Sequence, residues 1–262
     1  MKNSIKIFKK EIKEVIKNRS IWLPILAISI MFSVIFPAGL TMSTDSFLKD
    51  PDTTNFIAKV LQNTGNVEAA FLQFIIKQFM IFLLLIPAML PSLIAPASIV
   101  LEKESSTLEP LIATPIKTGE LLMGKTLTSM VPSFAISFIN FVLITVIVDT
   151  LAYIRFGLVP LPTLEWFIVT FILSPILSFI ITMASIIISS KSTDIRSAQG
   201  IGAVVIFPIY AVIGMQLAGL FLLNIKYLLA GCLVLLVVCP LVLKLAIRVF
   251  DRENILTKWK MK

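Results

Sequence analysis

The sequence predicts an all-α membrane protein with six transmembrane helices, and three observations lead to this fold class. Hydrophobic residues make up 57% of the 262 residues and charged residues only 15%, and the mean hydropathy is +0.97. The charged residues collect in a few clusters, whereas a soluble domain would need them along every surface element. The apolar runs between the clusters reach the roughly 20 residues with which a helix crosses a bilayer.

The six predicted spans are 21–40, 74–101, 126–148, 166–189, 200–221 and 227–250. The second span contains Pro87, Pro91 and Pro96, so we expect it to be kinked or broken. A membrane helix tolerates this when its neighbours satisfy the carbonyl groups that proline frees. The predicted organisation is an amino-terminal segment 1–20, a transmembrane domain 21–250 and a tail 251–262.

Residues 1–20 are predicted to form an amphipathic helix. Ile5, Phe8, Ile12, Val15 and Ile16 fall near one helical face, and lysines occupy mostly the other faces. This pattern is typical of a helix that lies in the membrane interface. Acidic residues within the basic region and the long apolar run that follows disfavour a secretory signal peptide.

The lysines and arginines predict the orientation of the spans. If the amino terminus is cytoplasmic, all but five of the 23 basic residues lie on the cytoplasmic side, and the five on the outer side are Lys49, Lys59, Lys77, Arg155 and Lys226. We therefore expect both termini in the cytoplasm. The net charge of +8 follows from this topology and from anionic lipid, so it requires no nucleic-acid partner.

The two longest predicted connections are 41–73 outside and 102–125 inside. The outer one is rich in turn residues and then reads NFIAKVLQN, which fits a short amphipathic helix, a gate segment or an ordinary ordered loop. For the inner one we expect two short helices. The first is capped by Thr107 and ends at Thr114, before Pro115, and the second begins near Thr118 with Glu120 in its first turn.

Residues 119–126 read GELLMGKT and match the pattern of a phosphate-binding loop. Such a loop needs a buried strand before it and small residues in its variable positions, but here the lead-in ATPIKT contains proline and the variable positions are ELLM. Asp149 resembles the magnesium-binding aspartate of nucleotide-binding proteins. It lies about 24 residues, or roughly 36 Å along a helix, from Lys125. We therefore expect no nucleotide binding by this chain. Gly124 and Lys125 are interpreted as the turn into the third span, with Lys125 facing the lipid headgroups.

The residue types exclude several classes of function. The chain has no histidine, the usual general base and the commonest transition-metal ligand. Cys232 and Cys239 lie roughly 10 Å apart along one predicted helix, too far for a disulfide. We therefore predict no catalytic residue, metal site or cofactor in this chain.

The predicted spans hold almost no ionisable side chains. Lys77 and Asp149 lie near outer ends, and Lys244 lies near an inner end. Secondary transporters tend to carry such groups deep in the membrane as ion relays. The energy for any transport must therefore come from elsewhere.

The inner loop carries a specific motif. It contains Glu102-Lys103-Glu104, Thr107-Leu108-Glu109, Leu111-Ile112, Thr114-Pro115-Ile116, Glu120-Leu121 and Gly124-Lys125. This resembles E-R-E-x-G-T-L-E-x-L-L-x-T-P-[VI], then E-[LI] and G-K, the signature of ABC transporter permeases of type 2, also called type V exporters. Lys103 and Ser106 depart from the usual arginine and glycine. The ending Phe250-Asp251-Arg252-Glu253 resembles the family's F-x-R-E tail.

The resemblance implies a permease subunit of an ATP-driven exporter in the cytoplasmic membrane of a prokaryote. In this family the loop supplies a coupling helix that docks on a separate ATPase, and two permeases pair so that substrate moves along their interface. The implied coupling residues are Glu102, Glu104, Thr107, Leu108, Glu109, Leu111, Ile112, Thr114, Pro115 and Glu120. The implied partners are two copies of an ABC ATPase subunit that binds ATP and magnesium, a second or homologous permease, and membrane lipid.

Polar and small residues within the spans are candidates for the pathway or the dimer interface: Pro91, Asn140, Gly202, Gly214 and Gln216. Hydrogen bonding and close packing between helices also explain them. An ATP-independent channel, or a scaffold that recruits cytosolic proteins through the same loop, is the alternative function. Peptides, drugs, lipids and ions all remain candidate substrates.

Overall fold

The computed structural model describes residues 2–43, 74, 76–104, 118–189, 192, 194–217 and 224–249. All regular secondary structure in these ranges is helical. Six helical stretches are long and apolar enough to cross a membrane: Trp22–Gly39, Ile76–Glu102, Thr118–Ile154, Leu164–Ser189, Ser197–Gln216 and Ile225–Val249. The predicted all-α fold with six transmembrane helices is therefore confirmed. The outer loop from residue 44 to 73 and the tail from residue 250 lie outside the described residues.

The amino-terminal helix α1 (Lys2–Lys17) leads directly into the first span. That span is built from α2 (Arg19–Ile30), a π-helical segment (Met31–Ile35) and α3 (Phe36–Met42). The Trp22 indole N–H donates to the Val15 carbonyl at 2.9 Å and ties the start of the span to α1. The π-helical segment lies just before Pro37, because a proline disturbs the regular hydrogen-bond ladder of the preceding turn.

The second span combines a 3₁₀ segment (Ile81–Leu84) with α7 (Leu85–Glu104). The helix is not broken at its prolines; the irregular turn precedes Pro87. Pro91 has no N–H for the Pro87 carbonyl, and the Ser178 hydroxyl donates to that carbonyl instead, at 3.0 Å. A side chain from another span thus replaces the missing hydrogen bond, as a continuous membrane helix requires.

The third span is longer than its predicted range 126–148, because α9 runs from Thr118 to Phe156. The predicted helix start near Thr118 is confirmed, with Glu120 in the first turn. At the other end the helix continues to Gly157, whose φ is +65° and whose N–H donates to the Tyr153 carbonyl at 3.0 Å. Glycine accepts this left-handed conformation without strain, and it ends the helix there.

The last three spans follow in order. The fourth is built from α10 (Leu164–Phe167), a π-helical segment (Ile168–Leu173) and α11 (Ser174–Ser189), the fifth is α12 (Ile195–Leu217), and the sixth is α13 (Ile225–Val249). The Asp194 carboxylate accepts the Ser197 N–H at 2.8 Å, which caps the start of α12. The Glu165 carboxylate accepts the Ile225 N–H at 3.2 Å and joins the start of α13 to α10.

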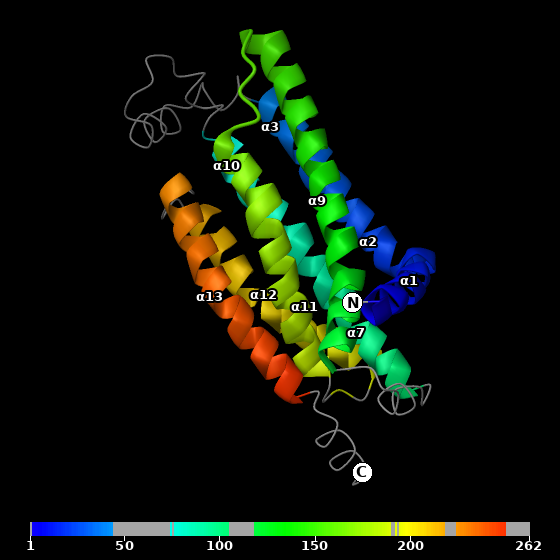
Figure 1. Cartoon of the computed structure of the whole chain (residues 1–262). Coiled ribbons are helices and arrows are strands. Elements are labelled where there is room, and N and C mark those ends of the chain that lie inside the picture. The colour runs from blue at the N-terminus through cyan, green and yellow to red at the C-terminus, as the bar shows by residue number, and fades with distance from the viewer. Residues whose placement is uncertain are drawn as a thin grey trace.

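Helix α7 lies within the bundle, behind α9 and α11 in the view of Figure 1. This helix packs against α9, α11 and α12. Buried residues make up 83% of the most apolar stretch of the second span, but only 11% of that of the last span. The second span is therefore the centre of the bundle, and α13 lies at its edge.

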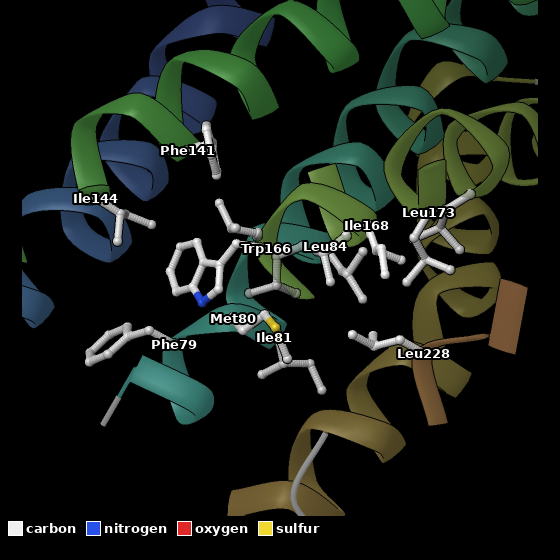
Figure 2. Packing of buried hydrophobic residues seen from close by; sticks show 14 of the residues in the cluster. Phe79, Met80, Ile81, Leu84, Phe141, Ile144, Trp166, Ile168, Leu173 and Leu228 are labelled. Carbon is white, nitrogen blue, oxygen red and sulfur yellow. The ribbon is translucent and has the colours of Figure 1, made fainter. Parts of the chain in front are cut away.

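The largest core cluster among the described residues includes the indole ring of Trp166, which is 1% exposed. Figure 2 shows this ring beside Phe79, Met80 and Ile144. Phe141 of α9 packs against the same indole, with ring centroids 6.4 Å apart. Because lipid tails are as apolar as these side chains, close packing rather than water exclusion holds the spans together here.

Candidate functional site

The most unusual polar group in the bundle is the Lys125 ammonium, which is enclosed by protein. The residue is 2% exposed. Its Nζ lies 2.8 Å from Glu11 Oε1 and 2.9 Å from Glu102 Oε2, and it donates to the Ser98 hydroxyl at 2.7 Å. The ammonium thus donates hydrogen bonds to Glu11 and Ser98, and the Glu102 carboxylate pairs with its charge.

The cluster joins three elements that are distant in the sequence. Glu11 lies on α1, Ser98 and Glu102 lie on α7, and Lys125 lies near the start of α9. The Ser98 hydroxyl also donates to Glu11 Oε2 at 3.3 Å. We call Glu11, Ser98, Glu102 and Lys125 the basal charge cluster, because it lies where α7 ends and α9 begins.

Two sequence interpretations at Lys125 are wrong. The side chain does not face lipid headgroups, because two carboxylates from neighbouring helices bind its ammonium inside the protein. Gly124 and Lys125 also do not form a turn, since both lie within the continuous helix α9. A buried lysine whose charge is paired does not need to reach water, so it does not end the helix.

Gly124 has a packing role instead. A Cβ at this position would lie 2.9 Å from the Ile7 Cβ and 3.1 Å from the Ser4 carbonyl oxygen of α1. Only glycine lets the two backbones approach so closely. This contact places Glu11, one turn farther along α1, within reach of Lys125.

The cluster links both ends of the 102–125 segment. Glu102 belongs to the last turn of α7, and Lys125 belongs to the second turn of α9. Their ion pair holds these two ends together, and Glu11 attaches both to α1. The cluster therefore connects α1, α7 and α9 at this end of the bundle.

Only some of the remaining predicted coupling residues lie in the described part of the structure. Thr107, Leu108, Glu109, Leu111, Ile112, Thr114 and Pro115 lie outside the described residues. Glu104 is the last residue of α7, and its side chain is outside the described part. Glu120 is half-buried in the first turn of α9.

Two of the predicted pathway residues join helices. Asn140 of α9 is 1% exposed, and its side-chain amide donates to the Ser29 hydroxyl of α2 at 3.4 Å. Gln216 of α12 is fully buried, and its side-chain amide donates to the Lys77 carbonyl at 2.8 Å. Each therefore makes a hydrogen bond between spans in this chain.

Of the other three pathway candidates, Pro91 and Gly202 lie at α7 and Gly214 does not contact it. Pro91 is buried in this helix. Gly202 of α12 packs on it so closely that a Cβ would lie 3.0 Å from the Ser92 carbonyl oxygen. Pro96 frees that same carbonyl, because it has no N–H to offer it. Around Gly214, in contrast, a Cβ would meet no atom within 4 Å.

The sequence interpretation missed Glu11 and Ser98 as partners of Lys125. A signal for Glu11 was present: it is spaced four residues from Ile7 and from Val15, on the side of α1 that packs against α9. An acidic residue on the packed side of a helix needs a buried cation, because an unpaired charge there is costly. Ser98 carries no comparable signal.

The comparison with protein-family models agrees with this architecture. The model described as ABC-2 family transporter protein matches residues 5–231, from α1 into α13. No curated protein matches the chain. Because the family model covers most of the chain, and because six helices are suited to cross a membrane, this multi-pass membrane protein is a transport component rather than an enzyme. The chain belongs to the ABC-2 family of transporter permeases.

Proposed function

We propose that this chain is the membrane-spanning permease subunit of an ATP-driven exporter. It would pair with a second permease, identical or homologous, and take up the movement of two ABC ATPase subunits through the 102–125 segment. Both termini and this segment would be cytoplasmic, in the cytoplasmic membrane of a prokaryote. Membership of the ABC-2 family supports a partner ATPase, because permeases of this family generally work with one.

The observation that carries the proposal is the basal charge cluster. A segment that receives mechanical work must be attached firmly to the helices that it moves. Here Glu102 and Lys125 close the two ends of the segment at 2.9 Å, and one of the two attached helices is α7, the centre of the bundle. Displacement of the segment would therefore reach α9, α11 and α12 through α7.

We infer that ATP and magnesium bind to the partner and not to this chain. Residues 119–126, which match the phosphate-loop pattern, lie in helix α9, whereas a phosphate loop presents unpaired backbone N–H groups to its ligand. The Lys125 ammonium is also bound by two carboxylates. A phosphate could reach this ammonium only by breaking both ion pairs.

Co-purification of this chain with a candidate ABC ATPase subunit tests the proposal. Leu108→Glu and Leu111→Glu should each abolish retention of the ATPase, because a charge at a docking residue opposes burial at the interface. Leu158→Glu is the matched control, since Leu158 is 43% exposed beyond the opposite end of α9, and it should retain the ATPase. Normal transport in a strain that lacks any ATPase partner would instead favour a channel or scaffold.

A further inference from the structure

Helix α1 has three distinct sides. The first side packs against α9 and carries the buried residues Ser4, Glu11 and Val15. The remaining surface is not uniform, because apolar and basic residues occupy separate parts of it. This division suggests a binding surface and not merely a solvated helix.

The second side is apolar and partly open. Ile5 is 47% exposed and Ile16 is 62% exposed, with the half-buried Ile12 between them. At about 100° per residue these three side chains follow one another along one flank of the helix. The predicted apolar face of α1 is therefore split: Val15 is buried in the protein, whereas Ile5 and Ile16 remain outside it.

The third side is basic. Lys6, Lys9, Lys10, Lys13 and Lys17 are all exposed. At helical spacing Lys9 and Lys13 lie next to the isoleucine flank, and the other three lie farther round. Their spacing of three or four residues places neighbouring ammonium groups on successive turns.

We propose that this side of α1 is a docking surface for anionic phospholipid. The isoleucine flank would enter the acyl region, and Lys9 and Lys13, at its border, would bind the phosphate groups. Two observations favour this occupant. The positive charge of the lysines is complementary to an anionic headgroup, and the exposed isoleucines lie beside the lysines as acyl chains lie beside headgroups in a membrane interface. A free phosphate or an acidic protein surface would match the lysines but leave the isoleucines unexplained.

The basal charge cluster gives this docking a consequence. Glu11 lies on the packed side of the same helix and contacts Lys125 at 2.8 Å. A lipid that fixes the position of α1 therefore also fixes the ends of α7 and α9. The lipid surface itself requires only that the chain is in a membrane; its effect on the 102–125 segment rests on the proposed function.

Lipid retention by the full-length protein tests the proposal directly. Native mass spectrometry of the detergent-purified chain, with phosphatidylglycerol or phosphatidylcholine added, should show preferential retention of phosphatidylglycerol. Each lysine near an anionic surface contributes about fivefold in affinity. The double variant Lys9→Gln with Lys13→Gln should therefore weaken retention of phosphatidylglycerol by about 25-fold. The matched control, Lys77→Gln with Lys226→Gln, removes the same charge at the far end of the spans and should change nothing.

Two further measurements distinguish a membrane lipid from a free phosphate as the ligand. Ile5→Ser with Ile16→Ser, both at exposed positions, should lower retention of both lipids, whereas free glycerol phosphate should displace neither. Equal retention of the two lipids, or an equal loss in the control variant, would overturn the proposal. So would a lysine variant that loses the ATPase while it keeps phosphatidylglycerol, because the surface would then bind protein. The lipid-retention experiment measures neither transport nor ATP hydrolysis. A negative result would therefore count against the lipid surface and not against the proposed function.

Discussion

Lys125 and Glu102 form an ion pair of 2.9 Å between the two ends of the 102–125 segment. Glu11 contacts the same ammonium at 2.8 Å from the amino-terminal helix. The side chains of Lys125 and Glu11 are only 1% and 8% exposed. Two carboxylates and one ammonium thus share a site from which water is largely excluded, and the consequences are measurable.

Removal of the ammonium alone should be strongly destabilising. Lys125→Met leaves Glu11 and Glu102 buried side by side, and removal of one partner from a buried pair costs about 3–5 kcal/mol. Thermal unfolding of the purified protein should show a clear fall in Tm. The triple variant Lys125→Met, Glu11→Gln, Glu102→Gln removes all three charges and should recover much of that loss. A Tm that is unchanged by Lys125→Met would contradict the ion-pair arrangement.

ATP binding provides a separate test of the same residue. Lys125→Ala should leave ATP binding by an assembled complex intact, measured with a fluorescent nucleotide on complexes that have been checked for ATPase content. The reason is that the phosphate loop is expected in the partner subunit. Loss of nucleotide binding at unchanged ATPase content would show that this interpretation of GELLMGKT is wrong.

The hydroxyl of Ser178 should stabilise the bundle through α7. Ser178→Ala leaves the Pro87 carbonyl without its donor, and an unsatisfied buried acceptor costs about 1–3 kcal/mol. Ser185→Ala is the matched control on the same helix, because its buried hydroxyl makes no hydrogen bond within the described structure. Equal melting temperatures of the two variants would argue against a bond between Ser178 and Pro87.

Gly202 and Gly214 should respond differently to the same substitution. A Cβ at Gly202 would lie 3.0 Å from the Ser92 carbonyl oxygen, so Gly202→Ala should force α12 away from α7 at a cost of about 1–3 kcal/mol. Gly214 has open space around it, and Gly214→Ala should stabilise its helix by up to about 1 kcal/mol. Thermal unfolding of the pair measures the difference, and the opposite order would contradict the close packing of α12 on α7.

Gly124 should determine how tightly α1 is attached. Gly124→Val would push Ile7 and the Ser4 carbonyl away from α9, so trypsin should cleave at the lysines of α1 much faster than in the unaltered protein. Gly119→Val is the control, because a Cβ there meets no atom within 4 Å. Equal cleavage rates in the two variants would show that α1 does not need this contact.

The sequence predicted most of the fold because each span is specified locally. In a bilayer every backbone N–H and C=O must be bonded within its own segment, so apolar length alone indicates a helix. The boundaries were less accurate, as α9 shows: its first turns carry Glu120 and Lys125, which hydropathy assigns to a connection. They are helical because Lys125 is paired inside the protein.

By itself the sequence determined the fold class, the number of spans, the amphipathic character of α1 and the motif between the second and third spans. Only the tertiary structure decided which groups meet: Glu11 with Lys125, Ser178 with the Pro87 carbonyl, and Gly202 with Ser92. The physical reason is one of range. Hydropathy and helical periodicity act within one segment, whereas an ion pair or a hydrogen bond between spans depends on how separate helices pack around α7.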